Sequence, residues 1–426
     1  MSRQELAGNN NQVPPGYKQT EVGVIPEDWE FCFIRDLIKQ EIIEKPLDGN
    51  HGNIHPKSND FVSVGIPFIM ANNVFNGVVD TNNCHFIKKE QADNLKKGFS
   101  FEGDILLTHK GTVGNVAVVS NILTEYIMLT PQVTYYRVKD FNKLNNIFIK
   151  FYFQSSQFQD KIQSLSGGGT RAYIGINNQQ SLPFLLPPLP EQKAIASVLS
   201  DVDELISSLD KLIAKKRHIK TATMQQLLTG KTRLPGFGEG KGYKKSAIGL
   251  IPEDWEVKQL GDVLKICHGK SQHHIISNDG IYPILGTGGE IGKTNTFLYN
   301  KPSVLIGRKG TIDAPIYIDT PFWTIDTLFY SQILSNANAK FIFYKFNLID
   351  WYSYNEASGV PSLNAATIED INQSFPTLPE QKAIASVLSD MDKEIAALEK
   401  RRAKTQGIKQ GMMQELLTGR TRLIKP

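Results

Sequence analysis

The stretch LPEQKAIASVLSD occurs twice without change, at Leu189–Asp201 and at Leu378–Asp390. The segment LLTGKTRL at Leu227–Leu234 returns at the same spacing as LLTGRTRL at Leu416–Leu423. An internal repeat reveals the architecture of a chain before any local pattern does. The two pairs mark the start and the end of two matched segments, which we name B1 and B2.

A third repeated motif, IPEDWE, stands at Ile25–Glu30 and again at Ile251–Glu256. It opens the segment before each B segment, so the chain has the order A1–B1–A2–B2. The B segments keep their length between the copies, whereas A1 is longer than A2. A segment of fixed length suits a spacer, and segments that differ in length and sequence suit recognition of different targets.

Both B segments have the pattern of long helices. Pro190 and Pro379 suit the first helical turn, and Gly230 and Gly419 suit the position just after the last turn. The apolar residues repeat every three or four positions, which predicts a coiled-coil seam. The seam residues are Ile195, Leu199, Val202, Ile206 and Leu209 in B1, and Ile384, Leu388, Met391, Ile395 and Leu398 in B2. Val198, Leu205, Leu212 and Ile219 widen the apolar face of B1, which predicts that helices of a partner pack there.

The A segments predict mixed α/β domains with many short strands, because short apolar runs are interrupted by Gly, Asn and Pro. Helices are expected at Asn145–Gln163 and Ala337–Tyr352. Buried anchors are expected at the two tryptophans of the IPEDWE motifs, Trp29 and Trp255. The predicted boundaries are a flexible tail at 1–18, A1 at 19–188, B1 at 189–232, a linker at 233–247, A2 at 248–377, B2 at 378–420 and a tail at 421–426.

Composition excludes several classes of protein. The chain has a formal net charge of +4, a pI near 8.6 and three isolated cysteines. A charge this mild does not by itself indicate a nucleic-acid binder, and an odd number of scattered cysteines disfavours a disulfide scaffold. The polar N-terminus and the lack of a long apolar run predict a cytoplasmic protein without a membrane partner.

Taken together, these motifs resemble the specificity (S) subunit of type I restriction–modification enzymes. The resemblance covers nearly the whole chain and rests on the segment order, the two helix starts, the two helix ends and the paired PEDW motifs. It implies that A1 and A2 are target recognition domains separated by an antiparallel coiled coil of B1 and B2. It also implies double-stranded DNA, two methyltransferase (M) subunits and restriction/translocase (R) subunits as partners. Because A1 and A2 differ, the DNA site should be bipartite and asymmetric.

The candidate DNA contacts lie in Lys-Gly-Thr loops, in Ser-Gly-rich loops and, in A2, in the loop that contains His273 and His274. Lys-Gly-Thr loops follow predicted strands in both copies, and a Ser-Gly-rich loop precedes each B segment. Glycine lets the backbone approach phosphate, while Lys, Thr and Arg supply hydrogen-bond donors. The candidates are His109, Lys110, Gly111, Thr112, Thr170, Arg171 and Tyr173 in A1, and His273, His274, Arg308, Lys309, Gly310, Thr311, Ser358 and Asn364 in A2. The alternatives are ordinary β-turns for the Lys-Gly-Thr loops and a flexible connector for the Ser-Gly-rich loop.

No pattern in the chain indicates catalysis. Gly230-Lys231-Thr232 lacks the upstream glycine of a P-loop, and His273-His274 with Cys267 lacks the usual spacing of zinc ligands. The sequence therefore predicts no cofactor in this chain, and the resemblance places S-adenosylmethionine, ATP and Mg²⁺ in the partner subunits.

Three alternatives stay open from sequence alone. The chain could serve a smaller system in which one fused methyltransferase–nuclease replaces separate M and R subunits. It could be a self-contained nuclease or methyltransferase, against which the missing motifs weigh. It could also be a protein-interaction scaffold that binds no DNA.

Overall fold

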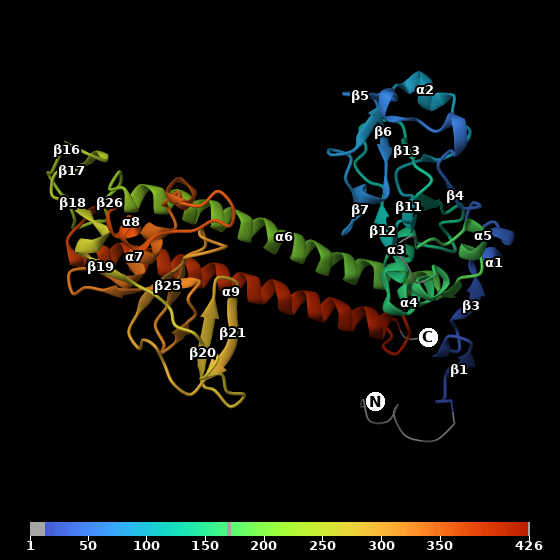
Figure 1. Ribbon diagram of the computed structural model, residues 1–426. Helices are drawn as coiled ribbons and strands as arrows, with labels where there is room; N and C mark the ends of the chain where they lie inside the picture. Colours follow the sequence, from blue (N-terminus) through green and yellow to red (C-terminus); the bar gives the residue numbers. More distant parts are fainter. Residues whose placement is uncertain (1–12, 168–171, 425–426) are drawn as a thin grey trace. The chain divides into compact units, whose positions relative to one another are not determined.

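The computed structural model describes residues 13–167 and 172–424 and divides the chain into two compact units (Figure 1). Unit 1 consists of Met1–Ser208 and Arg402–Pro426, and unit 2 consists of Leu209–Arg401. Each unit contains one A domain of mixed α/β structure together with parts of two long helices. The predicted fold class is therefore confirmed.

The long helices are α6 (Leu189–Leu228) and α9 (Leu378–Leu416), green and red in Figure 1. In unit 1 the start of α6 shares a core with the end of α9, through Ile195, Leu199, Leu416 and Leu417. In unit 2 the end of α6 shares a core with the start of α9, through Met224, Leu227, Ile384 and Leu388. Start packs against end in both units, so the helices pair in antiparallel orientation.

The seam predicted from the heptad pattern points inward. Its buried members are Ile195, Leu199, Ile206, Leu209, Ile384, Leu388 and Ile395. Val202, Met391 and Leu398 are partly buried. By contrast, Leu205, Leu212 and Ile219 are exposed on the same helix α6, so an apolar stripe remains on its surface.

The A domain of unit 1 contains two larger sheets. The first has six strands in the order β4-β14-β11-β12-β8-β7. These are β4 (Leu47–Asp48), β7 (Val74–Phe75), β8 (Gly77–Val79), β11 (Ile105–Lys110), β12 (Thr112–Val118) and β14 (Val133–Tyr136). The second has five strands in the order β10-β13-β6-β9-β5. These are β5 (Phe61–Val62), β6 (Ile66–Ile69), β9 (His85–Ile87), β10 (Phe99–Ser100) and β13 (Ile127–Leu129).

Two small sheets connect this domain to the long helices. The hairpin of β1 (Tyr17–Thr20) and β2 (Gly23–Pro26) leads into the first IPEDWE motif. Strand β3 (Glu30–Phe33) pairs with β15 (Pro183–Leu186), which runs directly into α6. The remaining short elements are α1 (Ile34–Lys39), α2 (Lys89–Asp93), α5 (Ile176–Gln179) and the 3₁₀ helices η1 (Gly52–Ile54), η2 (Ser58–Asp60) and η3 (Ala71–Asn73).

The helix predicted at Asn145–Gln163 is in fact two helices, α3 (Asn146–Gln154) and α4 (Ser156–Leu165). Ser155 lies between them with extended backbone angles, and its hydroxyl accepts a hydrogen bond from the Phe158 amide. A serine in this conformation caps the following helix and therefore starts a new one. The break lets Phe153 and Phe158 stack with their ring centroids 4.2 Å apart in the core.

Unit 2 repeats the plan with fewer strands. One sheet has the order β19-β25-β22-β23 and another the order β21-β20-β24. The strands are β19 (Leu264–Cys267), β20 (Tyr282–Gly286), β21 (Gly289–Thr294), β22 (Ser303–Gly307), β23 (Ile316–Ile318), β24 (Trp323–Thr324) and β25 (Leu328–Ile333). The smaller pairs are β16 (Tyr243–Ser246) with β17 (Gly249–Pro252), and β18 (Glu256–Gln259) with β26 (Asn372–Phe375). The helices are α7 (Ala339–Phe346), α8 (Ala365–Glu369), η4 (Leu260–Asp262) and η5 (Trp351–Tyr354).

The helix predicted at Ala337–Tyr352 ends earlier, at Phe346. The buried indole of Trp351 donates a hydrogen bond of 2.9 Å to the Phe346 carbonyl, which lies at the end of the helix. The chain then forms the separate 3₁₀ helix η5. The tryptophan thus satisfies the last backbone carbonyl of α7, and the chain beyond it is not part of that helix.

The repeated motifs meet in a cluster that we name the tryptophan clasp. In unit 1 it consists of Asp28, Trp29, Glu191 and Arg422. The indole of Trp29, fully buried as predicted, donates to the Glu191 carboxylate at 2.9 Å. Arg422 donates to Glu191 at 2.7 Å and pairs with both oxygens of Asp28 at 2.8 and 2.7 Å. This guanidinium lowers the pKa of Asp28 through its hydrogen bonds.

Unit 2 contains the same clasp, formed by Asp254, Trp255, Glu380 and Arg233. Arg233 donates to Glu380 at 2.6 and 2.7 Å and to Asp254 at 2.8 and 3.1 Å. Arg422 belongs to the predicted C-terminal tail and Arg233 is the first residue of the predicted linker, so both clasp arginines lie just outside the predicted B segments. Tyr17 and Lys18 lie in β1, not in the predicted N-terminal tail.

Glycine closes each clasp at the end of the helix. Gly419 and Gly230 have φ angles of +70° and +73°, the left-handed conformation of a helix cap. A Cβ at Gly419 would lie 2.4 Å from the Pro26 ring, and one at Gly230 would lie 2.5 Å from the Pro252 ring. The glycine therefore serves both as a cap and as the contact surface for the Pro-Glu-Asp-Trp motif.

Unit 2 also buries a lysine without an acidic partner among the described residues. The ammonium of Lys345 lies 3.3 Å from the Ser374 hydroxyl and 5.8 Å from the ring centroids of Trp255, Phe341 and Phe375. Burial lowers the pKa of Lys345 to about 7. The corresponding residue of α3 in unit 1 is Tyr152, which is also buried.

Replacing Arg422 with Met should lower the free energy of unfolding by about 3 kcal/mol, because the buried Glu191 carboxylate loses its cation. Chemical unfolding of the full chain measures this change. Arg420→Met is the matched control, since Arg420 is exposed in the same segment and should change stability by less than about 0.5 kcal/mol. Equal effects of the two substitutions would contradict a stabilising role of the clasp.

Replacing Lys345 with Met should stabilise unit 2 at neutral pH by about 2–4 kcal/mol. The lysine is protonated in the unfolded chain but resists protonation when it is buried, and methionine removes this cost of folding. The wild-type chain should gain stability as the pH rises from about 7 towards 10.5, where the unfolded lysine also loses its proton. The advantage of the variant should therefore shrink over this range. Thermal unfolding at several pH values tests this, and an advantage independent of pH would contradict it.

Candidate nucleic-acid interface

The Lys110-Gly111-Thr112 loop is the tight turn between β11 and β12. Gly111 has a φ angle of +79°, and all three residues are exposed. The Gly111 amide donates to the Ala172 carbonyl at 3.1 Å, and the Ile174 amide donates to the His109 carbonyl at 3.0 Å. These bonds fix the loop beside the segment that leaves the Ser-Gly-rich loop.

Unit 2 has the same arrangement at Lys309-Gly310-Thr311. Gly310 has a φ angle of +93°, and its amide donates to the Pro361 carbonyl at 2.9 Å. The Leu363 amide donates to the Arg308 carbonyl at 2.9 Å. The structure therefore brings the two predicted loops of each copy together, and it does so with one pattern of backbone hydrogen bonds.

His109 supports this loop from inside the domain. Its side chain is fully buried, and Nδ1 lies 3.1 Å from the Ile174 carbonyl. Burial lowers the pKa of His109, so the ring is neutral and its Nδ1–H donates to that carbonyl. A side chain without exposed surface cannot touch DNA in this conformation. The prediction of a DNA contact by His109 is therefore corrected to a supporting role.

The other candidates of A1 differ in what the structure describes. Tyr173 is 52% exposed beside the loop, and its ring centroid lies 5.8 Å from that of His109. Thr170 and Arg171 lie outside the described residues. Tyr173 therefore stays a candidate contact next to Lys110 and Thr112.

Among the candidates of A2, His273, His274, Lys309, Thr311 and Ser358 are exposed. Arg308 is half-buried, and its guanidinium donates to the Asp326 carbonyl at 3.3 Å. Asn364 instead caps α8, because its side-chain oxygen accepts a hydrogen bond of 2.9 Å from the Ala366 amide. This structural bond accounts for Asn364 without a DNA contact.

The strand order places one further loop next to these turns. The sequence patterns in A1 did not predict a DNA contact for this loop. β4 pairs with β14, and β14 pairs with β11, with neighbours antiparallel. The last residues of β4 and of β11 therefore lie next to the first residues of β14, at the same end of the strands. In unit 2 the corresponding strands β19, β25 and β22 are paired in the same way. A glycine just behind each of these outer strands is the signal that could have revealed this equivalence: Gly49 directly follows β4, and Gly269 is the second residue after β19.

Buried charges fix the loop that follows β4. Asp48 is almost fully buried, accepts a hydrogen bond from His51 at 2.8 Å and forms a short ion pair with Lys97. Burial acts to raise the pKa of Asp48, but the hydrogen bonds from Lys97 and His51 outweigh it, so the pKa is lowered. Asp48 is therefore ionised at neutral pH and anchors the loop.

The Lys-Gly-Thr turn and the neighbouring loop together expose hydrogen-bond donors on a backbone that is held in place by hydrogen bonds. Exposed Lys and Thr on a glycine turn suit phosphate contacts, and exposed His and Asn on the neighbouring loop suit base edges. Among the described residues no three His, Cys, Asp or Glu side chains are grouped so that they could hold a metal ion. No helix within the described ranges is long and apolar enough to span a bilayer.

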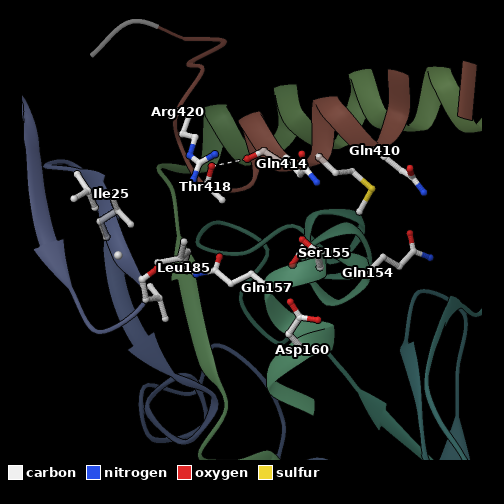
Figure 2. A pocket seen from close by; sticks show the side chains of 15 residues that line it. Ile25, Gln154, Ser155, Gln157, Asp160, Leu185, Gln410, Gln414, Thr418 and Arg420 are labelled. Carbon is white, nitrogen blue, oxygen red and sulfur yellow. Dashed lines mark hydrogen bonds between the residues drawn. The ribbon is translucent and has the colours of Figure 1, made fainter. Parts of the chain in front are cut away.

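A separate pocket of about 840 Å³ in unit 1 lies between the A domain and the end of α9. Figure 2 shows its lining, which includes Gln154, Gln157, Gln410 and Gln414. The lining also includes Asp160 and Ser155, whose hydroxyl caps α4. Amide and other polar side chains therefore form most of the pocket lining.

A family model described as the type I restriction modification DNA specificity domain matches residues 26–216 and 252–409. These two matches cover most of the chain. The chain belongs to the family of type I restriction–modification specificity subunits. The role of this family is DNA recognition, not catalysis.

Two relatives match over nearly the whole chain, and a third matches over part of it. A putative type I restriction enzyme MjaX specificity subunit from Methanocaldococcus jannaschii is 28% identical, over 96% of this chain and 97% of the relative. The MjaVIII specificity subunit of the same organism is 27% identical, over 94% of each chain. The EcoDI specificity subunit of Escherichia coli is 25% identical, over 38% of this chain and 36% of the relative.

Solved structures show the same fold. The S subunit of a type I system from M. genitalium matches with a TM-score of 0.60 and 16% identity, over 96% of this chain and 97% of its own. A chain from a study of complex assembly and conformational transition of the type I system matches with a TM-score of 0.54 and 14% identity, over 93% and 99%. At these identities the matches support the arrangement of domains and helices, not the role of single residues.

Proposed function

We propose that this specificity subunit recognises an asymmetric, bipartite site in double-stranded DNA and gives its partner enzymes their sequence address. The observation that carries the proposal is that the same loop occurs in both units. Each unit exposes a Lys-Gly-Thr loop that is held by the same pattern of backbone hydrogen bonds. The side chains around the two loops differ, with Tyr173 in one copy where Ser362 stands in the other. Two edges that differ in this way would recognise two different half-sites.

The helices α6 and α9 would set the number of unread base pairs between the half-sites. Their sequences start and end with the same motifs, and the helices are 40 and 39 residues long. At 1.5 Å per residue each helix is about 60 Å long, a length comparable to one or two turns of DNA. Each clasp ties an A domain to both helices, which would keep the half-site spacing constant.

The exposed stripe of α6 supports the proposed docking of methyltransferase subunits, with restriction subunits recruited through or beside them. Leu212 is 39% exposed and Ile219 is 42% exposed, one helical heptad apart. Apolar residues at this spacing suit the packing of a partner helix. The proposal assigns S-adenosylmethionine, ATP and Mg²⁺ to the partners and no cofactor to this chain.

Sequencing of methylated bases in a host that carries the complete system tests the DNA site. The expected result is one motif with two unlike halves and a fixed gap. Exchange of residues 19–188 for those of a relative should alter one half only, because the other edge and the helices are unchanged. A motif without two parts, or an exchange that alters both halves, would contradict the proposal.

Replacing both Leu212 and Ile219 with Glu should reduce co-purification of the methyltransferase subunit, because charged groups would be buried at the proposed helix contact. Both side chains are exposed in the isolated chain, so its thermal unfolding should change little. Ala214→Glu is the control, since Ala214 is exposed on another face of the same helix. Unchanged co-purification of the double variant would exclude this stripe as the docking surface.

A further inference from the structure

The loop after the edge strand, at residues 49–55 in unit 1 and 269–275 in unit 2, has the same backbone frame in both copies. A Cβ at Gly49 would lie 1.9 Å from the Leu129 carbonyl oxygen, and one at Gly269 would lie 1.9 Å from the Ile325 carbonyl oxygen. Real side chains do not fit at such distances, so only glycine allows these approaches. Both loops are therefore pressed against the segment that precedes the neighbouring strand, β14 or β25.

Further hydrogen bonds hold each loop in place. In unit 1 the Asn50 side chain donates to the Lys97 carbonyl at 2.5 Å and accepts from the Lys96 amide at 3.1 Å. In unit 2 the Lys270 amide donates to the Thr324 carbonyl at 2.8 Å, and the Trp323 indole donates to the Lys270 carbonyl at 2.9 Å. Side chains on loops anchored in this way lose less conformational freedom on binding than side chains on free loops.

On this common frame the side chains differ. The residues after the glycine are Asn-His-Gly-Asn-Ile-His in unit 1 and Lys-Ser-Gln-His-His-Ile in unit 2. The fourth residue after the glycine is Asn53 in one copy and His273 in the other. Both are exposed, and neither side chain has a hydrogen bond, ion pair or ring contact with a described residue. Their donors and acceptors are free to bind a ligand.

The distance from the Lys-Gly-Thr loops suits one groove of DNA. In unit 1, β4 is separated by the single strand β14 from β11, which carries Lys110. In unit 2, β19 is separated in the same way by β25 from β22, which precedes Lys309. At about 4.8 Å per strand the two loops emerge about 10 Å apart. The major groove is about 12 Å wide, so the lysine can contact phosphate while the neighbouring loop contacts base edges.

We propose that Asn53 and His273 determine specificity, each by reading a base in the half-site of its own unit. This inference rests on the proposed function and deepens it. The amide of Asn53 presents a donor and an acceptor side by side, which matches N7 and N6 of adenine. The imidazole of His273 presents a ring N–H, which suits the N7 acceptor of a purine.

The test uses the complete system in a host without competing methylation. Single-molecule sequencing maps the methylated motif for the wild type, Asn53→Ala and His273→Ala. Asn53→Ala should relax one position in one half-site, and His273→Ala should relax one position in the other, with the gap unchanged. Asn142→Ala and His218→Ala are matched controls, because both side chains are exposed outside these loops and should leave the motif unchanged.

Binding by the purified complex gives a second readout. The ratio of affinities for the cognate site and a site with one changed base should fall about tenfold or more for each loop variant, while binding to unrelated DNA is retained. Wild-type motifs and ratios in both variants would overturn the proposal, as would a relaxed position in the wrong half-site. Loss of discrimination together with a lower unfolding temperature would also overturn it, since that marks a structural role.

The experiment distinguishes a failure of the proposed function from a failure of the assignment of Asn53 and His273. If the wild-type system yields no bipartite motif, the proposed function fails before either variant is compared. If the wild-type motif is bipartite and the variants do not alter it, only the assignment of these two loops fails.

Discussion

The structure depends on one interaction, the ion pair between a buried helix-start glutamate and an arginine that follows the other long helix. Glu191 and Glu380 would be costly to bury alone, and each is compensated by a guanidinium and an indole N–H. The arginine also forms an ion pair with the aspartate next to the tryptophan. This joins the Pro-Glu-Asp-Trp motif, the start of one long helix and the segment after the other. Each A domain is thereby attached to both helices at once.

This constraint explains which parts of the repeat are identical. The motifs that recur contribute the buried Trp, the capping Gly, the helix-start Glu and the clasp Arg, all with partners that leave little freedom. The loops proposed to read DNA differ between the two units in most of their side chains. They share the Lys-Gly-Thr turn and the glycine after the outermost strand, where the backbone takes a positive φ angle or approaches a carbonyl too closely for a Cβ. One scaffold can therefore present different recognition chemistry at its two edges.

The treatment of charge follows the same division. Ionised groups inside the units are paired, as in the clasps and at Asp48 with Lys97. His109 and Lys345 are buried, and burial lowers the pKa of both side chains, so they tend to be neutral. The Nε2 atom of His109 lies 3.9 Å from the Asp48 carboxylate, but the effect of burial outweighs this attraction. The exposed lysines of the Lys-Gly-Thr loops remain available at the surface. The mild total charge of the chain is thus compatible with local basic sites, because most acids and bases compensate one another.

Repeats and apolar spacing are visible in the sequence, so they suffice to predict the segment order, the long helices and the burial of both tryptophans. The sequence also predicts the Lys-Gly-Thr loops, since a glycine turn after a buried strand is visible in it. The pairing of the buried Glu191 with Arg422, 231 residues away, is visible only in the folded chain. The tertiary structure likewise buries His109 under its own loop and places residues 49–55 beside it. These roles depend on partners supplied by distant segments, and no pattern within one segment can show which side chain meets which.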